Sequence, residues 1–301
     1  MSAANRQDVT FRSGESSCSG WLYLPDSEGP VPLVILGHGL GAVREMRLDA
    51  YAQTFAEAGL GALAFTYRHF GDSGGDPRQV ISIKDQLVDW EAALAFAKST
   101  PEIDAGRLAV WGSSFGGGHA ITIAARHPEL AAAVSQCPFT DGVASARQYG
   151  VVSSIKAMPA LGRDLFAAVT GREPVLIPIA APAGQVGLMN APDALDGYLG
   201  LVPEEAQFQN EAAPRIIPKL IGYRPGRSAA RVEMPMLFCV SMNDTVAPSG
   251  PTLRYAAEAP LGEIRRYAAG HFDFYTGRAF EEIVSDQTEF LVRHLLPEGS
   301  R

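Results

Sequence analysis

The most informative pattern in the chain is the run Trp111-Gly112-Ser113-Ser114-Phe115-Gly116, which fits G-x-S-x-G with Ser114 in the central place. A strand-like segment, 108–111, precedes it and a helix-like segment, 115–126, follows it. A sharp strand-to-helix turn brings backbone atoms close together at both flanking positions, so glycine is needed there. The turn would expose the serine hydroxyl above the sheet and leave the amide of Phe115 at a helix N-terminus, directed at developing negative charge. Taken alone, the five-residue pattern fits an ordinary turn as well as a catalytic serine.

Short apolar runs alternate with helical patterns on both sides of this motif. That alternation is typical of a mostly parallel sheet covered by helices on both faces. The expected strands cover residues 9–12, 20–24, 33–37, 60–67, 108–111, 131–136, 236–241 and 263–267, the first two forming a hairpin. The expected helices cover residues 47–58, 83–94, 115–126 and 280–296. The sequence therefore predicts an α/β fold.

The alternation stops between residues 141 and 231, where prolines are frequent and the helix-like pieces are short. We expect residues 1–140 and 232–301 to form the core and residues 141–231 to form a helical cap inserted over the carboxyl edge of the sheet. The apolar residues of this insertion include Leu161, Phe166, Val169, Leu176, Ile177, Ile179, Leu188 and Met189. They either bind a hydrophobic substrate or form the cap's own core, and the sequence leaves both alternatives open. Leu188 and Met189 are the predicted substrate contacts.

A glycine-rich loop, Gly37-His38-Gly39-Leu40-Gly41, directly follows the expected strand 33–37. In an acyl-transfer reaction, negative charge develops on the carbonyl oxygen, and losing one donor that stabilises it costs about 3 to 4 kcal/mol. Two donors are therefore expected. We predict that they are the backbone amides of Leu40 and Phe115, and that the His38 side chain orders the loop.

Two further residues complete a candidate catalytic set with Ser114. Asp244 follows the expected strand 236–241, and His271 follows the last strand. The carboxyl ends of parallel strands meet at one edge of the sheet, so the three side chains can converge there, and their order along the chain is that of the α/β-hydrolases. Ser114 would attack, His271 would take its proton, and Asp244 would hold the imidazole. Asp141 is a rival for the acid, whereas Asp273 is expected to order the histidine loop.

The composition excludes several classes of protein. The 301 residues are 47% hydrophobic and 19% charged, which indicates a globular chain rather than a disordered or fibrous one. The 25 basic residues against 33 acidic ones give a net charge of −8, so we expect no binding to nucleic acid. The most apolar run, 31–37, is far shorter than the roughly 20 residues that cross a bilayer.

The expected location is the cytoplasm. The first ten residues lack the apolar segment of a signal peptide, and Cys18, Cys137 and Cys239 are odd in number and widely spaced, as expected for reduced thiols. No zinc-binding spacing occurs, and no metal or other cofactor is implied.

These motifs resemble the α/β-hydrolase superfamily over most of the chain outside residues 141–231. They are the loop 37–41, the run Tyr67-Arg68-His69-Phe70-Gly71-Asp72-Ser73-Gly74, the G-x-S-x-G motif, Asp244, and Gly270-His271. Within the superfamily, the chain is similar to a bacterial and fungal group of capped serine hydrolases that includes the polyketide-transferase and esterase branch. Relatives commonly have an aspartate at the position of Thr66, which affects the local electrostatics but not the catalytic set. Serine at position 114 argues against the carboxylate nucleophile of epoxide hydrolases and haloalkane dehalogenases, and against the cysteine of dienelactone hydrolases.

The resemblance implies a serine hydrolase that cleaves a carboxylic ester or thioester of a medium-sized hydrophobic substrate through a Ser114 acyl-enzyme. An acyltransferase or a carbon–carbon bond hydrolase would use the same residues, and a catalytically silent binding protein is a third alternative. The expected partner is a small ester, thioester or polyketide-like molecule, without nucleic acid or membrane. The oligomeric state stays open, with a homodimer as one option.

Overall fold

The computed structural model describes residues 5–149 and 151–296. Eight strands form one sheet in the order β1-β2-β4-β3-β5-β6-β9-β10. Their bounds are β1 (Asn5–Ser13), β2 (Ser16–Leu24), β3 (Val31–Gly37), β4 (Gly61–Phe65), β5 (Ile103–Ser113), β6 (Ala132–Gln136), β9 (Met236–Ser241) and β10 (Gly262–Tyr267). The six strands β4, β3, β5, β6, β9 and β10 pair in parallel, and the hairpin β1–β2 adds two antiparallel strands at one edge. The predicted mostly parallel sheet is confirmed.

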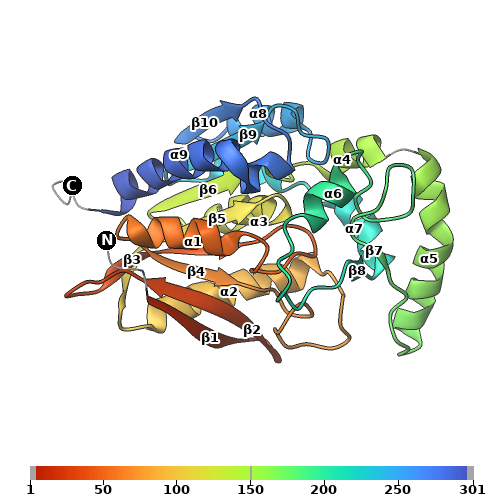
Figure 1. The fold of residues 1–301 in the computed structure, drawn as a ribbon, viewed down its shortest axis with the longest axis horizontal. Helices are drawn as coiled ribbons and strands as arrows, with labels where there is room; N and C mark the ends of the chain where they lie inside the picture. Colours follow the sequence, from red (N-terminus) through yellow and green to blue (C-terminus); the bar gives the residue numbers. More distant parts are fainter. Residues whose placement is uncertain (1–4, 150, 297–301) are drawn as a thin grey trace.

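Helices cover both faces of this sheet (Figure 1). They are α1 (Leu48–Glu57) and α9 (Gly277–Leu295) on one face, and α2 (Ile83–Ser99), α3 (Phe115–Ala124) and α8 (Ser249–Ala256) on the other. Alternate residues of β5 enter different cores, because successive side chains of a strand point to opposite faces. Trp111 packs with the α1 and α9 core, and Val110 packs with the α2 and α3 core. Burial on both faces explains why β3 is apolar throughout.

Residues 142–231 leave the sheet after β6 and return at β9, its neighbour in the sheet. They gather at one end of the molecule, where α5 lies at its outer edge (Figure 1). The elements are α4 (Gly142–Tyr149), α5 (Val151–Val169), β7 (Ile177–Pro178), α6 (Ala194–Leu199), β8 (Glu211–Ala212), η1 (Pro214–Ile216), α7 (Ile217–Gly222) and η2 (Pro225–Arg231). The expectation of short helical pieces is wrong for α5, which has 19 residues and continues through Pro159.

Within the described ranges, no helix has both the length and the apolar character needed to cross a bilayer.

Candidate active site

The turn between β5 and α3 is held by close backbone contacts. A Cβ atom on Gly112 would lie 2.1 Å from the carbonyl oxygen of Gly116, and one on Gly116 would lie 2.4 Å from the carbonyl oxygen of His38. Both positions therefore require glycine. Between them, Ser114 has a φ of 56° and a ψ of −117°, a conformation that L-residues rarely adopt. Such strain costs on the order of 1–3 kcal/mol and persists where the surrounding structure enforces it.

Ser114, His271 and Asp244 are brought together at the carboxyl edge of the sheet. The Nε2 atom of His271 lies 3.0 Å from the Oγ atom of Ser114, and its Nδ1 atom lies 2.7 Å from Oδ2 of Asp244. The imidazole and the carboxylate are 2% and 1% exposed, so water competes little for these bonds. The second oxygen of Asp244, Oδ1, accepts the amides of Val246 and Ala247, at 2.8 and 2.6 Å. One carboxylate oxygen is thus fixed by its own loop and the other faces the imidazole.

The rival acid Asp141 and the loop residue Asp273 have other hydrogen-bond partners. Asp141 accepts the amides of Val143 and Ala144, both at 3.0 Å, at the start of α4, and the hydroxyl of Tyr255. Asp273 accepts the amide of Gly270 at 2.8 Å, which closes the loop that carries His271.

The glycine-rich loop lies directly beside the serine, because Gly37 and Gly112 are partners in the β3–β5 register. A Cβ atom on Gly39 would come within 3.2 Å of the Cβ atom of Ser114. In the part of the chain that the structure describes, the backbone amides of Leu40 and Phe115 have no hydrogen-bond partner. These two free donors are available to a substrate oxygen next to Ser114. The carbonyl of Leu40 accepts the hydroxyl of Tyr198 at 2.8 Å, so α6 holds this loop in place.

The His38 ring hydrogen-bonds to its own loop and to Tyr67, which follows β4. Its Nδ1 atom donates to the carbonyl of Gly39 at 3.0 Å, and its Nε2 atom accepts the amide of Tyr67 at 3.4 Å. Burial lowers the pKa of His38 to about 4, so the ring is neutral at pH 7. A neutral ring fits this pattern of one donor and one acceptor nitrogen.

A largely apolar cavity of about 380 Å³ opens from Ser114 toward the segment 142–231. Leu188 and Met189, the predicted substrate contacts, both line it, and so does Leu161. Two other apolar residues of the segment, Phe166 and Val169, are 58% and 88% exposed, so they belong neither to the cavity nor to a core. A second cavity, of about 20 Å³, touches both Ser114 and His271.

Sequence reasoning missed a buried polar network beneath the serine. Ser113 shares a hydrogen bond of 2.6 Å with the hydroxyl of Tyr275 and accepts the side-chain amide of Gln136 at 3.0 Å. Gln287 donates to Gln136 at 2.7 Å and accepts the indole of Trp111 at 2.8 Å. The network joins the turn to the histidine loop, to β6 and to α9. No motif predicts it, because its members are far apart in the chain.

A second buried network joins α3 to the segment 142–231. His119 contacts Gln86 at 3.0 Å and the hydroxyl of Tyr223 at 2.8 Å. Burial, together with the nearby His38 and Arg126, lowers the pKa of His119 to about 3.

The Thr66 hydroxyl, at the position discussed in the sequence analysis, accepts the backbone amide of Arg44 at 3.1 Å.

Comparisons with known proteins indicate the family of the chain. The family model described as X-Pro dipeptidyl-peptidase (S15 family) matches residues 21–257. The quorum-quenching protein AidA of Acinetobacter baumannii (strain MDR-ZJ06) is 48% identical, over 95% of this chain and 94% of the relative. A thiohydrolase of Eupenicillium brefeldianum is 26% identical, over 96% and 94% of the two chains. The polyketide transferase ATR5 of Stachybotrys chlorohalonatus (strain IBT 40285) is 24% identical, over 97% and 99%.

The crystal structure of the α/β hydrolase GrgF from Penicillium sp. sh18 superimposes with a TM-score of 0.79, at 23% identity, over 97% of this chain and 99% of that one. The likeness shows the fold, and the family model covers well over half of the sequence. The predicted resemblance to α/β-hydrolases and to relatives named polyketide transferase is confirmed. The chain belongs to the S15 family, described as X-Pro dipeptidyl-peptidase, within the α/β-hydrolase superfamily.

Proposed function

We propose that this protein is a serine hydrolase that cleaves a carboxylic ester or thioester with a medium-sized hydrophobic acyl group. One observation carries the proposal: Ser114, His271 and Asp244 are hydrogen-bonded in series beside two free amides, at the inner end of an apolar cavity. Ser114 and Phe115 line that cavity together with Leu188 and Met189. An apolar acyl chain placed there would bring its carbonyl carbon to the serine.

In the proposed reaction, the Oγ atom of Ser114 attacks the carbonyl carbon while His271 Nε2 accepts its proton. Asp244 holds the imidazole through Nδ1 and stabilises the cation that forms. The amides of Leu40 and Phe115 would donate to the carbonyl oxygen as it becomes negative, and no bond has to be broken to free them. His271 then returns the proton to the leaving alcohol or thiol, which leaves an acyl group on Ser114.

The segment 141–231 acts as a cap in this proposal. It supplies most of the apolar lining of the larger cavity, and α6 holds the Leu40 loop through Tyr198. Cytoplasmic location is part of the same proposal, since Cys18, Cys137 and Cys239 are buried free thiols.

The names of the relatives support a small acyl substrate better than a peptide. By their names, one relative is a thiohydrolase and another transfers a polyketide, which keeps transfer to a second molecule as the second candidate function. A peptide with a free N-terminus would need a carboxylate to pair with its ammonium group. None of the described residues that line the larger cavity is acidic. We therefore do not extend peptidase activity to this chain.

The decisive experiment combines a fluorophosphonate probe with an acyl-ester panel. We expect the probe to label Ser114, as located by peptide mass spectrometry, and Ser114→Ala to abolish both labelling and turnover. The matched control is Ser113→Ala, which removes a hydroxyl that faces Tyr275 rather than His271 and should retain most of the activity. Labelling that survives Ser114→Ala would refute the assignment.

A further inference from the structure

Two cavities have Ser114 as a shared lining residue, and the smaller of them is also lined by His271. The larger cavity, of about 380 Å³, is lined by Ser114 and by apolar residues of the segment 142–231, and His271 is not among its lining residues. The smaller cavity, of about 20 Å³, is lined by both Ser114 and His271. We call this smaller space the histidine chamber. Its other walls come from Leu48, Tyr198, Leu201 and Phe272, among others.

The histidine chamber has room for one water molecule. On the same measure, a cavity needs roughly 10 to 15 Å³ to hold a water. Ser114 Oγ and His271 Nε2 are polar groups at its boundary, so a water there has partners. A volume of about 20 Å³ leaves little room for an acceptor larger than methanol.

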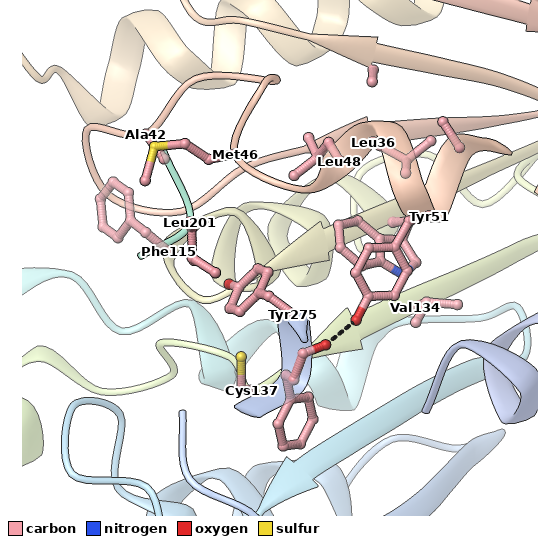
Figure 2. Close-up of a cluster of buried hydrophobic side chains, with 14 of the residues drawn as sticks. Leu36, Ala42, Met46, Leu48, Tyr51, Phe115, Val134, Cys137, Leu201 and Tyr275 are labelled. Carbon is pink, nitrogen blue, oxygen red and sulfur yellow. Dashed lines mark hydrogen bonds between the residues drawn. The ribbon is translucent and has the colours of Figure 1, made fainter. Parts of the chain in front are cut away.

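The walls of the chamber are closely packed. Leu48 is 1% exposed and Leu201 is 8% exposed, and both belong to the core on the α1 side of the sheet. Figure 2 shows Leu201 with Met46, Leu48 and Tyr275, which line the same chamber. The hydroxyl of Tyr198 is bound to the carbonyl of Leu40, so this wall is fixed to the loop that carries a candidate oxyanion donor.

The nucleophile that releases the acyl group must reach His271 Nε2, because that nitrogen takes its proton. With the acyl chain in the larger cavity, the space next to Nε2 is the histidine chamber. We propose that the histidine chamber is the acceptor subsite, and that its size admits water and excludes larger alcohols and amines. This inference rests on the proposed acyl-enzyme mechanism and decides between its two candidate reactions. The enzyme is then a hydrolase rather than an acyltransferase.

The step balances as follows. The oxygen of the chamber water bonds to the acyl carbon while His271 Nε2 accepts one of its protons. The bond between the acyl carbon and Ser114 Oγ then breaks, and Nε2 returns the proton to Oγ. The products are a free carboxylic acid and the regenerated serine. By microscopic reversibility the leaving oxygen departs through the same space. Methyl esters should therefore be better substrates than butyl esters of the same acid.

The test measures how the acyl-enzyme divides between water and an alcohol. Methyl octanoate serves as the donor with butanol in the buffer, and chromatography gives the ratio of butyl octanoate to octanoic acid. We expect octanoic acid as the main product of the natural protein. Leu201→Ala widens the chamber and should raise the ratio roughly tenfold or more, the discrimination that a methylene-sized difference gives. Leu48→Val is a milder second variant that should raise it less.

The matched control is Leu188→Ala, which widens the larger cavity alone. It should change the preferred acyl length and leave the ratio unchanged. Butyl octanoate as the main product of the natural protein would overturn the inference, and so would an equal rise of the ratio in Leu188→Ala. If no donor gives either product and no acyl-enzyme is seen by mass spectrometry, the proposed function itself fails and the inference fails with it.

Discussion

The β5–α3 turn and the segment 142–231 form walls of the same cavity, but they are held in place by different forces. Backbone atoms hold the turn, since Gly112 and Gly116 leave no room for a side chain. Pairs of side chains far apart in the chain hold the segment. One example is Arg215 in η1, whose Nε donates to Oδ2 of Asp164 on α5 at 2.8 Å. The glycines that the turn requires lie within five residues of each other and leave a pattern in the sequence. A contact between residues 51 positions apart does not.

The proposed catalytic residues lie on the β5–α3 turn and on the loops that follow β9 and β10. Asp244→Asn should lower kcat by about 10⁴, because the imidazole loses the group that fixes its tautomer. Asp141→Asn, directly before the segment 142–231, should change kcat little, since that carboxylate contacts Val143, Ala144 and Tyr255. Steady-state hydrolysis of methyl octanoate measures both. The reverse ranking would move the acid to Asp141.

The next largest effect concerns the stability of the segment. The Asp164 side chain is fully buried and pairs with Arg215, which is 19% exposed, so Asp164→Asn weakens charge-assisted hydrogen bonds and should cost about 1.5–3 kcal/mol in the free energy of unfolding. Lys98→Gln is the matched control, because the Lys98–Glu129 pair is exposed and such pairs contribute about 0–1 kcal/mol. Urea unfolding monitored by tryptophan fluorescence compares them. Equal losses would mean that apolar packing, not this pair, holds α5.

Acid should weaken both regions through two buried histidines. The pKa of His38, beside the turn, is lowered to about 4, and that of His119, which contacts Tyr223, is lowered to about 3. The unfolded chain takes up these protons near pH 6.5 while the native protein does not, so stability is full above that pH and falls as the pH drops toward 4. At pH 5 each histidine should cost about 2 kcal/mol relative to neutral pH.

The measurement is the free energy of unfolding in urea at several pH values between 7 and 4.5. His119→Gln should remove about half of the decline, since glutamine does not titrate. An unchanged slope in this variant would show that the decline has another origin.

The smallest effect concerns selectivity. Leu188→Ala should shift the preferred ester toward longer acyl chains, severalfold in kcat/KM, because the lining residue loses three carbons. Leu94→Ala makes the same change in the α2 core, away from both cavities, and should lower the melting temperature without changing chain-length preference. A shift in preference with Leu94→Ala would remove the distinction between cavity and core.

The sequence predicted the sheet and the positions of the candidate catalytic residues because both depend on local patterns. Strand β3 is apolar at nearly every position, and Ser114 is flanked by two glycines that its turn requires. Helix α5 was not predicted, since Pro159 normally ends a helix and here does not.

The polar network around Ser113 and Gln287 was also missed. Its residues come from four separate elements. The residues next to a polar side chain in the sequence do not indicate which distant group it will contact. The same is true of Tyr198, whose contact with Leu40 joins residues 158 positions apart.

The contact between Tyr198 and Leu40 would couple the proposed cap to the loop 37–41. The hydroxyl of Tyr198 restrains the same residue whose amide is a candidate donor to the substrate oxygen. If α6 swings away to admit substrate, the loop loses this restraint and its donor is no longer fixed. Substrate entry and oxyanion stabilisation could not then occur at the same time. The reaction would begin only after the substrate is enclosed.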